Sequence, residues 1–240
     1  MTGLSDRSLG KRITASWVLQ RLATLLSVVA LTLVLLAAVT GVLLAFYYEP
    51  SAGEAFNSLR WITEFVPGGN LIRSLHDIAG NGIIGIAILQ IFVMFLGRRQ
   101  QVSWFAAWIS GWLLVIAAIG LGWTAVILDW DQVGYWRFKI EVGTFGSLPL
   151  VGGLIRTLLL GGDSISSVTV AHLYTFHSYL LSIGAVVLAI VHLGTLLYQE
   201  RFSHRETLTA AGLEAASQIE PIAGQSLADQ SLTTESYPVP

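Results

Sequence analysis

The chain has 240 residues, a formal net charge of −2, a hydrophobic fraction of 54% and only 12% charged residues. Its mean hydropathy is +0.68. Soluble domains carry about a quarter charged residues, so this composition excludes an ordinary water-soluble globule, a disordered chain and a basic nucleic-acid binder. The sequence has no cysteine, which excludes disulfides, thiolate metal sites and thiol catalysis. Metal binding is left to the five histidines and the carboxylates.

Four apolar stretches are long enough to cross a bilayer, which takes about 20 residues. They run from Leu22 to about Tyr48, from about Ile78 to Leu96, from about Val102 to Leu128 and from about Ser164 to Gln199. Backbone polar groups in lipid must pair within the segment, and runs of this length without alternation indicate helices. We predict an all-α integral membrane four-helix bundle at 22–199, preceded by a segment at 1–21 and followed by a polar, disordered tail at 200–240.

The basic residues predict the orientation of these spans, because positive charge collects on the inner side. They flank the first span, the short second loop and the end of the fourth span (Arg7, Lys11, Arg12, Arg21, Arg98, Arg99, Arg201 and Arg205). With four spans these places share one side, so we expect both termini inside. The first and third loops then lie on a periplasmic or lumenal side.

The third loop, from about Asp129 to Asp163, carries two further predictions. The stretch WDQVGYWRFKIEVG mixes aromatic and basic residues, as helices that lie in a membrane interface do. The glycines and proline of GSLPLVGG predict a turn before a second short interfacial helix. Asp129 and Asp131 are interpreted as capping or solvating this loop rather than performing acid–base chemistry.

Histidines at membrane depth indicate function, because burying an ionisable group is costly. We expect His76 about one turn inside the outer end of the second span, and His177 a few turns into the fourth. Both spans run inward, so the two side chains can lie at one depth. Two imidazoles at one level across a bundle are what a six-coordinate haem iron requires. Hydrogen bonding of a lone histidine to a neighbouring helix remains the alternative.

A deeper pair of positions is incomplete. His192 follows His177 by 15 residues, which is about 22 Å and four turns along a helix. The residue 14 positions after His76 is Gln90, which is polar but is not a usual haem ligand. His172 is expected near the outer boundary, and His204 beyond the membrane.

Several segments carry a family resemblance when they are taken together. They are TGVLLAFYYEP, LIRSLH, LDWDQVGYWRFKI, and LPLVGGLIRTLLLGG followed by SSVTVAHLYTFH. The chain resembles, over about residues 17–199, the N-terminal four-helix half of cytochrome b from quinol-oxidising bc complexes. It looks closest to the short form, cytochrome b6, whose ligands on the last helix have this 15-residue spacing.

The resemblance implies a role for each candidate site residue. His76 and His177 would ligate an outer haem b, and Arg73 would pair with a propionate. A guanidinium suits a carboxylate well. His192 would take the inner ligand position, so the metal-ligand candidates are these three histidines. Two glycines that admit the porphyrin in the family are present as Gly41 and Gly111.

The chain also departs from the family pattern. Gln90 replaces the inner histidine, and Ser27 and Ala125 replace glycines. Three outer positions change as well: Asp77 stands in place of a basic residue, His172 in place of an arginine, and Asp129 in place of a proline. The first span has no cysteine to anchor the covalent extra haem of cytochrome b6. We therefore predict one haem b, at the outer site. The inner site is either empty or holds a five-coordinate haem on His192 beside Gln90, and we favour no normal inner haem.

The expected function is an electron-transfer or accessory subunit of a photosynthetic or respiratory membrane complex, rather than a self-contained enzyme. It would be a multi-pass protein of a bacterial inner or thylakoid membrane. Two alternatives stay open: a scaffold or assembly subunit that kept the fold without redox function, and a quinol-oxidising subunit completed by a partner. Expected partners are bilayer lipid and other membrane subunits, with quinone as a candidate ligand. No nucleic-acid partner is expected.

Overall fold

The computed structural model describes residues 3–97, 102–202, 205, 209 and 213, with side chains from residue 17 and, after the gap, from residue 105. The chain divides into two compact units, Met1–Leu196 and Leu197–Pro240, and the bundle core and the site lie in the first. Arg98, Arg99 and His204, and most of the predicted tail, fall outside the described residues. The predicted orientation and domain boundaries stay predictions.

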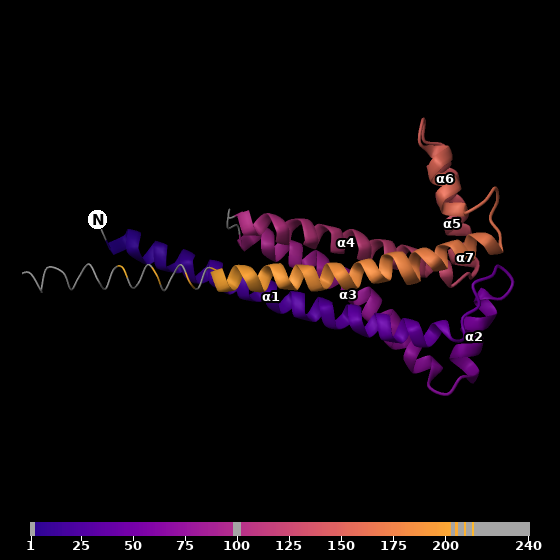
Figure 1. Cartoon of the computed structure of the whole chain (residues 1–240), viewed down its shortest axis with the longest axis horizontal. Helices are drawn as coiled ribbons and strands as arrows, with labels where there is room; N and C mark the ends of the chain where they lie inside the picture. The colour runs from indigo at the N-terminus through magenta and orange to yellow at the C-terminus, as the bar shows by residue number, and fades with distance from the viewer. Residues whose placement is uncertain (1–2, 98–101, 203–204, 206–208, 210–212, 214–240) are drawn as a thin grey trace, which may run out of the picture. The chain divides into compact units, whose positions relative to one another are not determined.

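Four long helices run alongside one another in the first unit (Figure 1). They are α1 (Gly3–Ala45), α3 (Gly69–Gly97), α4 (Val102–Leu128) and a last helix that comprises α7 (Ser167–Thr175), the π-helical turn η1 (Phe176–Leu181) and, within this unit, residues 182–196. Each is long and apolar enough to cross a membrane, over Trp17–Ala45, Gly69–Gly97, Phe105–Leu128 and Ser167–Phe202. The predicted all-α fold with four spans is confirmed.

The second span begins earlier than the apolar run indicated. We expected it from about Ile78, but α3 starts at Gly69, so LIRSLHD belongs to the helix. Arg73 and Asp77 lie in its first turns, where polar side chains can reach water. His76 is therefore about two turns inside α3, rather than the one turn that we predicted.

Three short helices gather at one end of the bundle, where α1 ends and α3 begins (Figure 1). We call this the outer end. Both helices predicted in the third loop are present, as α5 (Gln132–Gly146) and α6 (Gly152–Leu160). Asp131 caps α5, because its side chain accepts a hydrogen bond from the Gly134 backbone N–H. The helix α2 (Ala55–Phe65) in the first loop was missed, although Ala55, Leu59 and Ile62 show helical spacing.

Buried apolar residues form three clusters that follow one another along the helices. The outer cluster joins α2, α4, α5, α6 and α7 (Ala55, Ile127, Leu128, Phe138, Val142, Leu160, Val170 and Leu173). The middle cluster joins the four long helices (Val34, Ile83, Leu114, Ala117, Ala118, Ala185 and Ala189). The inner cluster does the same (Ala23, Val93, Met94, Ala107 and Leu196). Alanine is frequent because small residues let membrane helices approach closely.

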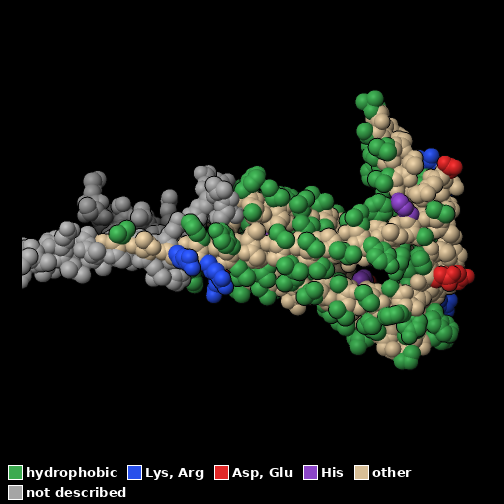
Figure 2. All heavy atoms as spheres, viewed as in Figure 1, with side chains coloured by type: hydrophobic (Ala, Val, Ile, Leu, Met, Phe, Trp, Pro, Cys, Tyr) green, Lys and Arg blue, Asp and Glu red, His purple; other side chains and the backbone are tan. Residues whose placement is uncertain are grey.

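The outward faces of the long helices are apolar, and Figure 2 shows hydrophobic side chains along much of their visible surface. Large side chains such as Val39, Ile88, Ile116 and Ile183 are between 51% and 62% exposed. Continuous apolar surface on this scale is a liability in water, but in lipid it contacts hydrocarbon. The exposed faces therefore fit a bilayer as the solvent.

Candidate functional site

Two histidines face one another between the outer and middle clusters. His76 comes from α3, and His177 comes from the π turn η1 of the last helix. Their ring centroids are 6.3 Å apart and the ring planes make an angle of 54°. The structure thus brings together the two residues that the sequence pattern paired by depth.

A neighbouring helix accepts a hydrogen bond from the Nδ1 atom of each of these rings. The Nδ1–H of His76 donates to the Ala37 carbonyl on α1 at 2.9 Å, with the Thr40 hydroxyl 3.2 Å away. His177 Nδ1 lies 2.8 Å from the Thr124 hydroxyl on α4, which itself donates to the Gly120 carbonyl and so accepts from the imidazole. A carbonyl oxygen, or a hydroxyl that already donates elsewhere, accepts a hydrogen bond from Nδ1–H, which leaves the lone pair of each ring on Nε2.

The spacing of the two rings suits one metal ion between them. A first-row metal binds an imidazole nitrogen at about 2 Å, and two imidazoles on opposite sides of it have centroids about 6 Å apart. Among the described residues no three His, Cys, Asp or Glu side chains gather as a metal site. An ion held here by two imidazoles needs its remaining ligands from elsewhere, as the four nitrogens of a porphyrin would supply.

The deeper pair, Gln90 and His192, lies between the middle and inner clusters and is closed. Both side chains are buried, at 2% and 0% exposed. His192 Nδ1 lies 2.9 Å from the Ser110 hydroxyl, which donates to the Ala106 carbonyl. The proton is therefore on Nδ1, and the Nε2 lone pair accepts a hydrogen bond from Gln90 Nε2 at 2.6 Å.

The Gln90 amide completes a polar contact among all four long helices. Its nitrogen also donates to the Ala23 carbonyl on α1 at 3.3 Å, while its oxygen is buried with no partner. Two axial nitrogens around an iron lie about 4 Å apart, so a 2.6 Å contact leaves no place for a metal or a macrocycle. The residues of the inner position do not fit a haem in this arrangement.

Two glycines contact the imidazoles directly. A Cβ on Gly41 would lie 3.0 Å from His76 Cε1, and a Cβ on Gly111 would lie 3.0 Å from His192 Cε1. Both distances are tighter than ordinary van der Waals contact. The predicted glycines are thus close-approach positions for the histidine rings.

The supporting residues recur every 14 positions, which returns to the same helix face after about four turns. Each hydroxyl that holds a histidine precedes one of the small residues discussed above (Thr40–Gly41, Ser110–Gly111 and Thr124–Ala125), and the fourth place is Leu26–Ser27. Sequence reasoning missed these hydroxyls, although this repeat could have found them. At the fourth place, which is the one beside Gln90, the repeat has Leu26 and therefore no hydroxyl group.

The two residues of each pair lie at the same depth, although the histidines of the last helix are further apart in sequence than their partners on α3. His177 and His192 are 15 residues apart, whereas His76 and Gln90 are 14 apart. The π turn at Phe176–Leu181 contains His177, and a π turn accommodates one residue more than an α-helical turn.

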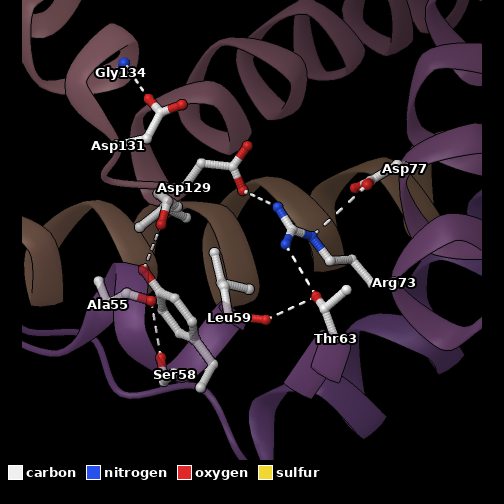
Figure 3. Close-up of polar contacts among 11 residues, drawn as sticks. Ala55, Ser58, Leu59, Thr63, Arg73, Asp77, Asp129, Asp131 and Gly134 are labelled. Atoms are coloured by element: carbon white, nitrogen blue, oxygen red, sulfur yellow. Dashed lines mark hydrogen bonds and ion pairs between the residues drawn. The ribbon is translucent and has the colours of Figure 1, made fainter. Parts of the chain in front are cut away.

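Arg73 lies one turn outward of His76 and is engaged by protein groups (Figure 3). Its guanidinium bonds the Asp129 carboxylate at 3.0 Å and the Thr63 hydroxyl at 3.1 Å, with Asp77 at 4.0 Å. Burial raises the pKa of Asp129, and the nearby Asp77 and Asp131 raise it further, against the lowering effect of Arg73. The predicted capping role is seen at Asp131, whereas Asp129, which is 48% exposed, is in addition the counter-ion of Arg73.

His172 does not join the outer pair. Its Nε2 donates to the Leu158 carbonyl at 2.7 Å, and its ring packs against Gly161, where a Cβ would lie 2.9 Å from it. Gly161 has φ of 65° and ends α6, a conformation that glycine adopts without strain. His172 thus fastens α6 to α7, which supports no role at the outer pair.

Comparisons with known proteins agree with the fold. Residues 10–200 match the family described as Cytochrome b/b6/petB. Cytochrome b6 of Desmonostoc sp. (strain PCC 7906) is 35% identical over 164 residues, 68% of this chain and 76% of that protein. Cytochrome b6 of Synechococcus elongatus is 33% identical over the same shares.

A solved structure shares the fold. A chain of a hyperthermophilic respiratory Complex III is 24% identical with a TM-score of 0.63, over 72% of this chain. The match spans 47% of that longer chain, so this chain corresponds to about half of its length. The family match over residues 10–200 and the identity to cytochromes b6 show that the chain belongs to the cytochrome b/b6 family of membrane proteins.

Proposed function

We propose that this protein is a b-type cytochrome that holds one haem b between His76 and His177 at the outer end of the bundle. The observation that carries the proposal is the pair of facing imidazoles with ring centroids 6.3 Å apart. Both rings are held by Nδ1 and keep a lone pair on Nε2. Two imidazoles spaced in this way, each with a free Nε2 lone pair, would hold one iron between them.

The haem, when bound, supplies an iron that accepts and releases one electron. The protein's own residues set the conditions for that exchange. Ala37, Thr40 and Thr124 fix the imidazole tautomers. The ion pair of Arg73 with Asp129 lies one turn outward, and the outer and middle clusters exclude water. An apolar surround and hydrogen-bonded ligands are the means by which a protein tunes such an iron.

The inner position limits how far electrons can travel through this chain. A route across the bilayer needs two centres, and the contact between Gln90 and His192 occupies the place of the second. We therefore propose one haem per chain and electron exchange on the outer side only. The similarity to cytochromes b6 and to a respiratory Complex III chain supports a role in a bioenergetic membrane complex. Quinone remains a candidate ligand of that complex.

A scaffold or assembly role is the second candidate. It is favoured by the inner network, which joins four helices through side chains without a cofactor. A haem count separates the two proposals. The purified full chain should carry one low-spin haem b by pyridine haemochrome and electron paramagnetic resonance. A native protein without haem would support the scaffold role. Two six-coordinate haems per chain would contradict the proposal that Gln90 prevents haem binding at the inner position.

A further inference from the structure

The function proposed above assigns no role to Asp129. This residue follows α4 directly, and its side chain is 48% exposed. It reaches across to α3 and bonds the Arg73 guanidinium at 3.0 Å (Figure 3). Arg73 is also the cation nearest to His76 along α3, so a charge on Asp129 acts next to the outer pair.

The ion pair lines a cavity of about 400 Å³ at the outer end. The cavity is bounded by α2, by the start of α3 and by the residues after α4 (Phe56, Leu59, Arg60, Thr63, Glu64, Arg73, Asp129 and Asp131). A space of this size that is lined by charged side chains admits water, and two of those side chains, Arg60 and Glu64, are exposed. A proton can therefore pass between solvent and Asp129 without crossing the apolar core.

We propose that Asp129 sets the reduction potential of the outer haem by neutralising Arg73, so that the potential falls when the carboxyl group ionises. The inference rests on the proposed haem between His76 and His177. An added electron on the iron is opposed by a nearby negative charge and favoured by an uncompensated guanidinium. Protonation of Asp129 removes the negative charge of the carboxylate and leaves the positive charge of Arg73 uncompensated. The reduction potential of the haem therefore rises.

The surroundings of Asp129 place its titration above the ordinary range of an aspartate, which is near pH 4. Burial, together with the nearby Asp77 and Asp131, raises the pKa of Asp129 in spite of the lowering effect of Arg73. The charged and titratable groups around it are Arg73 and Asp77 from α3, Asp131 from its own loop, Tyr48 after α1, and Arg60 and Glu64 from α2. Burial raises the pKa of Tyr48, so that phenol stays neutral while Asp129 titrates.

The test is a redox titration of the full haem-loaded chain in detergent, followed by the α band from about pH 5 to about pH 9. In the wild type the midpoint potential should fall as pH rises. In Asp129→Asn it should be higher at neutral pH and should lose much of that pH dependence. Asp129→Ala, which removes the carboxylate and offers no amide that can bond Arg73, should give the same upward shift.

Glu64→Gln is the matched control, because Glu64 lines the same cavity but bonds Arg60 at 2.8 Å. It should shift the potential less than either Asp129 variant. Haem-loaded variants with the wild-type spectrum and an unchanged midpoint potential would overturn this inference and leave the proposed function standing. A wild-type chain that binds no haem would overturn both.

Discussion

The outer and inner ends of the bundle are two versions of one arrangement. At each end a histidine of the last helix donates from Nδ1 to a hydroxyl on α4, Thr124 at the outer end and Ser110 at the inner end. A glycine contacts a ring at each end. The ends differ in the residue offered by α3. His76 stands off His177 with centroids 6.3 Å apart, whereas the Gln90 amide bonds His192 at 2.6 Å.

This difference shows that supporting residues do not by themselves specify a cofactor. Ser110 and Gly111 fit His192 as Thr124 fits His177, yet they support a closed side-chain contact. An amide carries a donor that an Nε2 lone pair attracts, so glutamine draws the two helices' side chains together. Two imidazoles in the same tautomer present lone pairs to one another and remain apart until a metal joins them.

The largest expected effect separates the two histidines of the last helix. His177→Ala should abolish the six-coordinate haem spectrum, because it removes an axial ligand. His192→Ala should keep that spectrum, because His192 is hydrogen-bonded to Gln90. Optical and electron paramagnetic resonance spectra of both variants test this, with His204→Ala as a control. A low-spin spectrum that survives in His177→Ala would remove this residue as a ligand.

The second prediction converts the inner end into a copy of the outer one. Gln90→His combined with Ser27→Gly restores an imidazole and a small residue, so the haem content should rise from about one to about two per chain. Gln90→His alone should remain near one, because Ser27 is 1% exposed in the packed core and its side chain fills space that a haem would need. Pyridine haemochrome assays of both variants give the count. An unchanged count in the double variant would show that more than these two residues closes the site.

The sequence predicted the elements that depend on composition and spacing. Long apolar runs determine helices in lipid, and the match in depth of His76 and His177 follows from helix direction and rise. The two helices of the third loop were also predicted, because a stretch of aromatic and basic residues there is followed by the glycines and proline of a turn. The start of α3 was misplaced, since Arg73 and Asp77 interrupt the apolar run although they lie inside the helix.

Three side-chain contacts could not be predicted from the sequence, because each depends on how the helices pack. That Gln90 meets His192, 102 residues further along the chain, depends on the distance between two helices, which neither polar side chain reveals. The pairing of Asp129 with Arg73 joins positions 56 residues apart. His172 was expected near the outer boundary, and only the path of α6 shows that it bonds the Leu158 carbonyl.

The third prediction concerns the hydroxyl behind the outer ligand. Thr124→Val removes the group 2.8 Å from His177 Nδ1 while keeping the side chain's shape. Loss of such a supporting contact costs about 10–100-fold in affinity, so the variant should lose haem faster to an acceptor protein. Thr32→Val is the matched control, since the Thr32 hydroxyl bonds only the Val28 carbonyl of its own helix at an exposed place. Equal haem loss in both variants would show that Thr124 does not hold the ligand.

The smallest expected effect tests whether the inner network ties the helices together. Gln90→Leu removes donors to His192 and Ala23, but it also removes an amide oxygen that is buried without a partner. Each lost bond costs about 1 kcal/mol and the unpaired oxygen returns part of that cost. The haem-loaded chain should therefore unfold about 2–4 °C lower for a net loss of about 1 kcal/mol.

Circular dichroism melting in detergent measures this difference, and the outer haem spectrum should not change. Gln132→Leu is the control, because the bond from Trp136 Nε1 to Gln132 at 3.1 Å lies on an exposed face of α5 and exposed polar contacts contribute little. A Gln90→Leu chain that melts at or above the wild-type temperature would show that apolar packing alone holds the inner end. The closed site would then be a remnant of haem loss rather than a substitute for the haem.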